Sequence, residues 1–133
     1  MEALNEMIRA LLEESDGTAA LANVSACIKE TMPGLNWAGF YLVRSGELVL
    51  GPFQGRVACT HIPFARGVCG ACYRTKQAQR VDDVRTFQDH IACDAASRSE
   101  LCVPVLIENE VMAEIDLDAP VPDFFTAADE KKM

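Results

Sequence analysis

The chain has 133 residues, half of them hydrophobic, with six cysteines and a formal net charge of −8. A chain of this length forms one domain around one core, so we expect a single domain over residues 1–133. The negative charge argues against nucleic-acid binding, which needs clustered lysine and arginine. No apolar run approaches the roughly 20 residues of a membrane-spanning helix, and the start of the chain is acidic where an export signal is basic. We therefore expect a cytoplasmic protein whose cysteines serve catalysis, metal binding or packing rather than structural disulfides.

The order of elements predicts an α+β domain. Apolar residues at helical spacing and Gly or Pro stops predict helices at 2–14, 18–31, 69–77 and from about 126. Alternating or β-rich segments predict strands at 37–43, 47–53, 57–62, 100–107 and 111–117. Turns at Ser45-Gly46 and Asn109-Glu110 join two pairs of these strands into hairpins, and 81–92 is predicted to be irregular. We therefore expect a mainly antiparallel sheet with helices packed against it.

The last predicted strand carries acidic residues on one face. Glu114, Asp116 and Asp118 alternate with apolar residues, so they point the same way. Glu100 begins the partner strand of the hairpin and can join them. They are either a solvated face or a shielded cluster, in which like charges raise the pKa values and the group binds a cation, accepts an amino group or holds a proton.

Three of the cysteines lie near turns and charges rather than on apolar stripes: Cys59, Cys69 and Cys93. Cys69 stands at a predicted helix start, where free amides and the helix dipole favour a thiolate. Asp94 follows Cys93; its side chain can cap a helical turn, while its charge opposes thiolate formation.

The other cysteines have plainer interpretations. Cys27 in the second helix and Cys102 in a strand are interpreted as small buried hydrophobic residues. Cys69 and Cys72 form a C-x-x-C pair, but it lacks the preceding buried strand and Trp of a thioredoxin-type centre.

A possible zinc site and a pair of aromatic residues each allow two interpretations. A zinc site could be formed by Cys69, Cys72, Cys93 and His90, which are suitable ligand types. It lacks a second closely spaced pair of ligands, so we expect no metal. Trp37 and Tyr41 share one strand face. They are either core residues or an aromatic wall for an ammonium or thioether group.

Together these segments resemble the free methionine-(R)-sulfoxide reductases, a family of GAF domains. The resemblance runs from about 36 to 120, and the cysteine spacings of 10 and 24 residues match the family's three-cysteine pattern. Its motifs are NWAGFYL from Asn36, LGPFQG from Leu50 leading to Ala58-Cys59, GVCG from Gly67, HIACD from His90, Ser99-Glu100 and Asp116-Leu117-Asp118.

The resemblance implies a GAF fold, usually found as a homodimer, and a function under oxidative stress. It implies that Cys93 attacks the sulfoxide sulfur, releases methionine and becomes a sulfenic acid, with Cys69 as the alternative nucleophile. Cys59 or Cys69 then forms a disulfide with it, and thioredoxin or a similar external dithiol reduces that disulfide, without any other cofactor.

The resemblance also implies a substrate pocket for free methionine sulfoxide. Glu100, Asp116 and Asp118 match the family's acidic residues, which hold the substrate's ammonium group and hydrogen-bond its sulfoxide oxygen. Trp37 and Tyr41 match its aromatic wall.

The chain departs from the family pattern in several places. Glu114 stands where an apolar or small residue is usual, Cys72 and Cys102 are additional thiols, and the chain ends at Met133, before the family's usual long C-terminal helix. The alternatives are a GAF module that binds or senses a small molecule without catalysis, and a zinc-stabilised domain.

Overall fold

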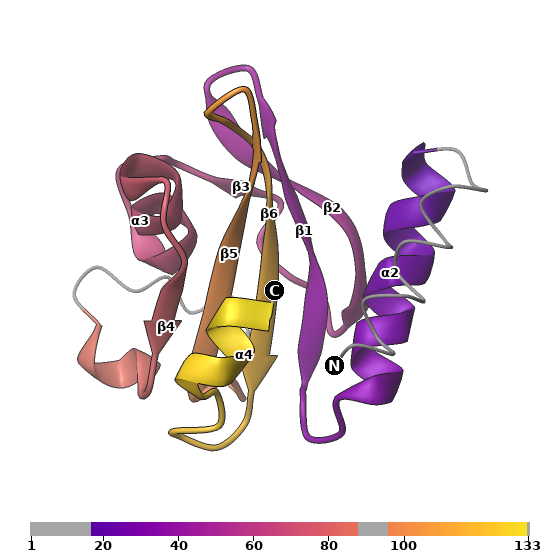
Figure 1. The fold of residues 1–133 in the computed structure, drawn as a ribbon, viewed down its shortest axis with the longest axis vertical. Helices are drawn as coiled ribbons and strands as arrows, with labels where there is room; N and C mark the ends of the chain where they lie inside the picture. Colours follow the sequence, from indigo (N-terminus) through magenta and orange to yellow (C-terminus); the bar gives the residue numbers. More distant parts are fainter. Residues whose placement is uncertain (1–16, 88–95, 133) are drawn as a thin grey trace.

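The computed structural model of the chain describes residues 17–87 and 96–132 (Figure 1). The predicted helix 2–14 lies outside these residues, as do His90 and Cys93. In the described part of the chain, no helix is long and apolar enough to cross a membrane.

A six-stranded sheet forms the centre of the fold, and every neighbouring pair in it is antiparallel (Figure 1). Its spatial order is β3-β2-β1-β6-β5-β4, so the two long hairpins lie side by side. The strands are β1 Trp37–Arg44, β2 Glu47–Gly55, β3 His61–Ile62, β4 Gln79–Val81, β5 Ser99–Ile107 and β6 Glu110–Ala119.

Both predicted hairpins are confirmed, and their turns have the backbone that tight hairpins require. Ser45 and Gly46 both have positive φ, which matches the twist of the flanking strands. The second turn lies at Glu108 and Asn109, also at positive φ, one residue earlier than predicted.

The predicted third strand is wrong over most of its length. Only His61–Ile62 pairs with the sheet, through Leu48 and Val49 of β2. Val57 is 88% exposed. This segment lies at the sheet edge with a partner on one side only, so β-propensity alone does not keep it in the ladder. The region predicted as irregular contains the end of β4 and a short 3-10 helix, η1, at Val84–Thr86.

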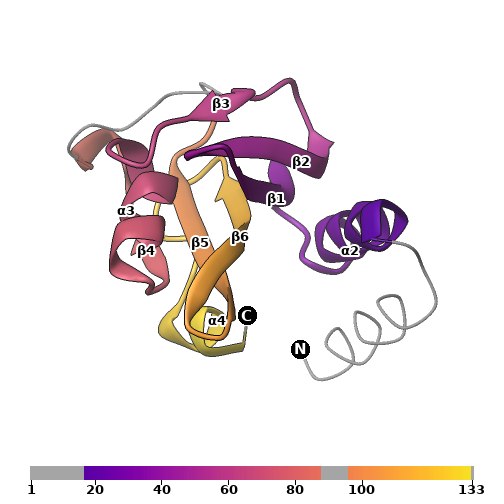
Figure 2. The ribbon, with the colours of Figure 1, turned by 90° about the horizontal axis from the view of Figure 1, so that it is seen from above.

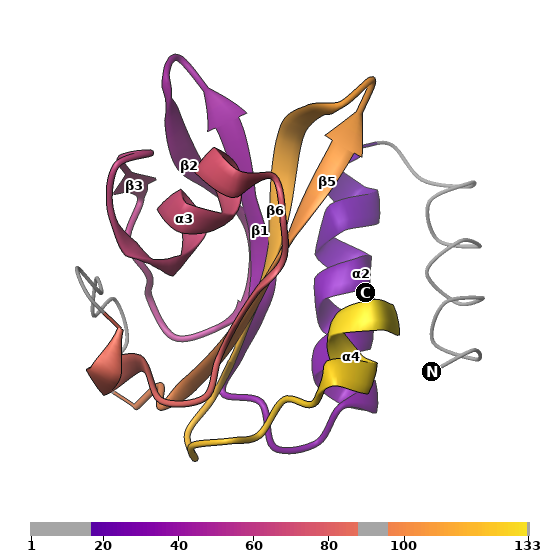
Figure 3. The same cartoon turned by 60° about the vertical axis from the view of Figure 1, so that its left-hand side comes forward.

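Two helices cover opposite faces of the sheet. Helix α2, Gly17–Thr31, packs on β1 and β2, and α3, Gly67–Thr75, lies over the other face (Figures 2 and 3). A last helix, α4, spans Ala127–Lys132. Thr126 caps it, because its hydroxyl accepts from the Asp129 amide while the Asp129 carboxylate accepts from the Thr126 amide.

Alternation along the strands separates two hydrophobic clusters. Ala38 and Phe40 of β1 point toward α2, in a cluster that also holds Cys27 and Leu117. Trp37 and Tyr41 of β1 lie on the opposite face, in a cluster with the three cysteines Cys69, Cys72 and Cys102. Every side chain of the candidate site that the structure describes on β1, β5 and β6 lies on this second face.

Candidate active site

The register of three strands brings the predicted acidic residues together. Asp118 of β6 lies between Trp37 of β1 and Glu100 of β5, and Asp116 lies between Gly39 and Cys102 in the next row. Because side chains on one strand face repeat every second residue, these two rows are adjacent. The predicted convergence of Glu100, Asp116 and Asp118 is confirmed, and we call these three residues the acidic cluster.

Most of these carboxyls are shielded from solvent. Glu100, Asp116 and Glu114 are 7%, 5% and 0% exposed, and Asp118 is partly buried. The interpretation of the β6 carboxylates as a solvated face is therefore wrong. It failed because α3, which covers this face, comes from a distant part of the sequence.

Burial controls the protonation of the cluster. It raises the pKa of Glu100 well above its ordinary value, and the charges of Asp116 and Asp118 raise it further. Burial also raises the pKa of Asp116, although hydrogen bonds from Glu100 and Cys69 partly offset this. Both shifts favour the protonated form of these two carboxyls, which lie buried beside the aromatic residues.

An aromatic wall lines the same face. Trp37 stacks on Tyr41 with 6.0 Å between ring centroids and on Phe53 of β2 with 5.1 Å. The Trp37 indole donates to the carbonyl of Arg56 at 3.2 Å, and this bond orients the ring. Sequence analysis predicted that Trp37 and Tyr41 share a face but missed Phe53, whose position depends on the β1–β2 register.

Gly39 makes the stacking possible. A Cβ there would lie 2.3 Å from the Cβ of Phe53 and 2.8 Å from a ring carbon of Trp37. Only the absence of a side chain at this position lets the two rings close over the strand.

The surroundings of Cys69 do not favour the thiolate that its position at a helix start predicts. It lies in the first turn of α3 and is 4% exposed. A hydrogen bond from Cys102 lowers the pKa of its thiol, but burial and the neighbouring carboxylates raise it to a net value well above the ordinary one. The prediction of a thiolate favoured by the helix start is therefore wrong, because dehydration and like charge outweigh the helix dipole.

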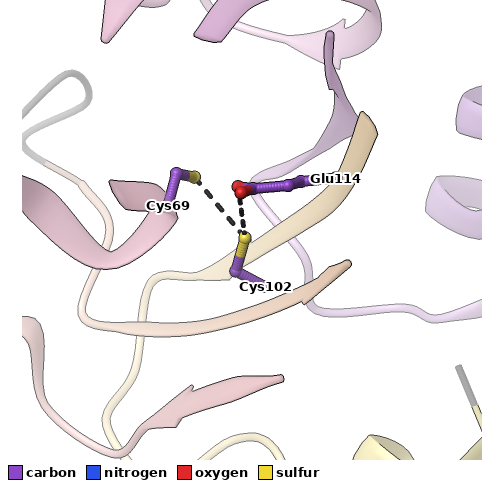
Figure 4. Close-up of side chains that lie close together, drawn as sticks. All are labelled: Cys69, Cys102 and Glu114. Carbon is purple, nitrogen blue, oxygen red and sulfur yellow. Dashed lines mark hydrogen bonds between the residues drawn. The ribbon is translucent and has the colours of Figure 1, made fainter. Parts of the chain in front are cut away.

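Cys102 is buried as predicted, but its contacts are polar. Its single thiol proton can be donated either to Glu114 Oε1, 3.1 Å from the sulfur, or to Cys69 Sγ, 3.6 Å from it (Figure 4). We call Cys69, Cys102 and Glu114 the thiol cluster. Burial raises the pKa of Glu114 to about 8. Sequence analysis noted all three residues separately but missed their contact, which forms across α3, β5 and β6.

The remaining described cysteines divide into one bonded and two free. Cys59, between β2 and β3, is disulfide-bonded, and its carbonyl accepts a hydrogen bond from Tyr41 at 2.9 Å. Cys27 and Cys72 are free and buried. The Cys72 thiol donates to the carbonyl of Cys102 at 3.7 Å rather than forming a disulfide within the C-x-x-C pair.

Metal-ligating groups are close enough together in two places among the described residues. They are the thiol cluster and the set of Cys69, Glu100 and Asp116. Neither includes Cys72, and His90 and Cys93, the other two ligands of the zinc site that the sequence analysis rejected, lie outside the described residues. His61 lies at the sheet edge, where it contacts Glu47 at 3.2 Å.

The chain flanking residues 88–95 is fixed on both sides. Arg98 contacts Asp83 at 3.1 Å, and this hydrogen bond lowers the pKa of the Asp83 carboxyl. Ser97, next to Arg98, accepts a hydrogen bond from Asn36 at 3.0 Å. Asp83, before residues 88–95, is therefore joined to Arg98 after them, and Ser97 is held to the chain just before β1.

The fold and the sequence define the class of protein. A GAF domain family model matches residues 5–131, so the chain is a GAF domain. The match extends beyond the 36–120 span over which the motifs suggested it.

The relatives are more specific. The chain is 47% identical to the free methionine-R-sulfoxide reductase of Escherichia coli over 98% of this chain and 79% of that protein. It is 40% identical to the enzyme of the same name from Saccharomyces cerevisiae, over 88% of this chain and 72% of that one. Among solved structures, free methionine-R-sulfoxide reductase from Neisseria meningitidis in complex with its substrate superposes with a TM-score of 0.91 at 42% identity, covering 96% of this chain and 77% of that one. The chain belongs to the free methionine-R-sulfoxide reductase family.

Proposed function

We propose that this chain reduces the R-sulfoxide of free methionine to methionine. One observation carries the proposal: a buried acidic cluster lies beside an aromatic wall in a chain that is 47% identical to a reductase of that name. A pocket of this kind suits a ligand with a cationic amino group at one end and a polar sulfur group at the other.

The acidic cluster is proposed to recognise the amino acid. Asp116 and Asp118 bind the ammonium group of the substrate, and Trp37 with Tyr41 packs against its thioether chain. A methionine within a peptide has no ammonium group, so the pocket selects the free amino acid.

Glu100 is proposed to deliver the proton that the reaction needs. Oxygen leaves the sulfur far more easily as hydroxide than as oxide, so the S–O bond breaks as the oxygen is protonated. The burial of the Glu100 carboxyl and the neighbouring carboxylates support this role, because both raise its pKa and so favour its protonated form.

Thiol chemistry supplies the electrons. The Cys93 thiolate attacks the sulfoxide sulfur and forms an S–S bond as the protonated oxygen leaves as hydroxide. Hydroxide then attacks the Cys93 sulfur and breaks that S–S bond, which releases methionine and leaves a sulfenic acid. A second thiol then displaces water and forms a disulfide, which an external dithiol reduces by exchange. We assign the second thiol to Cys59, because it is disulfide-bonded whereas Cys69 is a buried free thiol of raised pKa.

The proposed surroundings follow from this chemistry. The reductant is thioredoxin or a similar dithiol, and no other cofactor takes part. The free thiols among the described residues suit the reducing cytoplasm, where the enzyme repairs methionine under oxidative stress. The working unit is proposed to be a homodimer, and exposed apolar residues around the β5–β6 turn, Leu106, Ile107 and Met112, support an association surface.

Turnover of separated sulfoxide epimers tests the proposal. The R epimer of free methionine sulfoxide should be reduced with a dithiol, whereas the S epimer and a peptide-bound sulfoxide should not. Equal rates on free and peptide-bound substrate would contradict the proposed pocket. Binding of the free epimer without any turnover would favour the sensor alternative instead.

A further inference from the structure

The thiol cluster is built from three elements that meet under α3. Cys69 comes from α3, Cys102 from β5 and Glu114 from β6, and all three side chains point into one space (Figure 4). Their ligand atoms all lie within 4.8 Å of one another, and all three residues are buried. The 3.6 Å between the two sulfurs is close to the roughly 3.8 Å expected for two thiolates tetrahedrally bound at about 2.3 Å from one Zn²⁺.

Glu114 supplies an independent sign that a ligand is expected here. It is 0% exposed, and its Oε2 is buried without a hydrogen-bond partner among the described residues. Leaving a buried polar atom unsatisfied costs about 1–3 kcal/mol. A cation between the carboxylate and the two sulfurs would pair with this oxygen.

We propose that Cys69, Cys102 and Glu114 bind one Zn²⁺ ion. The donor set selects this cation, because two thiolates disfavour Mg²⁺ and Ca²⁺, while a carboxylate disfavours Cu⁺. On binding, both thiols and, below its pKa, the Glu114 carboxyl release their protons to solvent, and the ion accepts an electron pair from each of the three groups. Three protein ligands leave the fourth tetrahedral position for water or another small ligand.

The site adjoins the acidic cluster. The Cys69 thiol donates a hydrogen bond to Glu100 Oε2 at 3.8 Å, and an ion on Cys69 replaces that proton, so it removes a hydrogen bond from the residue proposed to protonate the substrate. Zn²⁺ is therefore a reversible inhibitor of the reductase. This consequence rests on the proposed function, whereas the binding itself does not.

Calorimetric titration of the reduced, metal-free full chain with Zn²⁺ tests the binding. Wild type should bind about one ion per chain. Cys102→Ala and Glu114→Gln should each weaken binding at least 10- to 100-fold, since loss of a direct ligand costs no less than loss of its supporting contacts. Cys27→Ala is the matched control, because it removes a buried thiol on the other face of the sheet, and it should leave the affinity within about twofold.

The double variant Cys59→Ser/Cys93→Ser excludes the other reactive thiols and should retain binding. Co²⁺ should give thiolate-to-metal absorption in wild type and in this double variant, and lose much of it in Cys102→Ala. If Cys102→Ala does not fold, Glu114→Gln and Cys102→Ser decide the question. Unchanged affinity in the cluster variants, loss of binding in the double variant, or no saturable binding at all would overturn the proposal. Because none of these measurements uses turnover, they are independent of whether the chain is a reductase.

Discussion

Glu114→Gln should make the metal-free protein more stable at high pH, with little change at low pH. The side chain of Glu114 is fully buried, and burial raises its pKa from the ordinary 4.5 to about 8. Between these two values the folded chain holds a proton that the unfolded chain releases. Stability therefore falls as pH rises through this window. Glutamine carries no titrating proton, so the variant lacks this loss.

The size of the effect follows from the shift. Each pH unit in the window costs about 1.4 kcal/mol, so wild type should lose about 3–4 kcal/mol between pH 5 and pH 8 that the variant does not lose. Any change in packing is the same at both pH values and cancels from this difference. In a chain of this size the effect corresponds to roughly 10 °C in melting temperature.

Urea unfolding at pH 5 and pH 8, with a chelator present, measures the difference directly. Glu110→Gln is the control, because Glu110 is exposed on the same strand, and it should change the free energy of unfolding by less than about 0.5 kcal/mol at either pH. Parallel pH profiles for wild type and Glu114→Gln would refute the reasoning, because they would mean that Glu114 is ionised in the folded protein.

Three further predictions concern the proposed reaction. Gly39→Ala should destabilise the fold by about 1–3 kcal/mol in thermal melting and lower kcat/KM, because the new Cβ lies 2.3 Å from the Cβ of Phe53. Gly17→Ala is the control: its Cβ meets nothing within 4 Å, so it should change neither quantity. Cys59→Ser should release one equivalent of methionine and then stall with a sulfenic acid that dimedone traps, whereas continued turnover with thioredoxin would remove Cys59 from the resolving role. Asp118→Asn should lower kcat/KM about 10²-fold while the melting temperature stays near that of wild type, because the variant loses a charge-assisted hydrogen bond to the substrate's ammonium group; near-normal turnover would exclude Asp118 from substrate binding.

Local pattern predicted much of the fold and of the acidic cluster. Alternation in β6 placed its carboxylates on one face, and the hairpin placed Glu100 opposite Asp118. Both follow from a period of two residues and one turn, which are visible in the sequence.

What the sequence did not predict depends on contacts between distant segments. The burial of Glu114 and the raised pKa of Cys69 both arise because α3 covers this face of the sheet, and nothing near either residue shows that. Phe53 lies in the aromatic wall because of the register between β1 and β2, which pairs it with Gly39. The predicted third strand was wrong for a similar reason. Its length depends on how many of its residues pair with β2, and only His61 and Ile62 do so.

The acidic residues of β6 also restrict how the sheet can assemble. A slip of β6 by one residue against its neighbours would turn every side chain to the opposite face. Glu114 and Asp116 would then enter the hydrophobic cluster beneath α2, and Leu117 would leave it. Unpaired charges in an apolar core cost several kcal/mol each. Glu114, which weakens the native fold as pH rises toward 8, therefore destabilises the misaligned sheet as well, and together with Asp116 it favours a single strand alignment during folding.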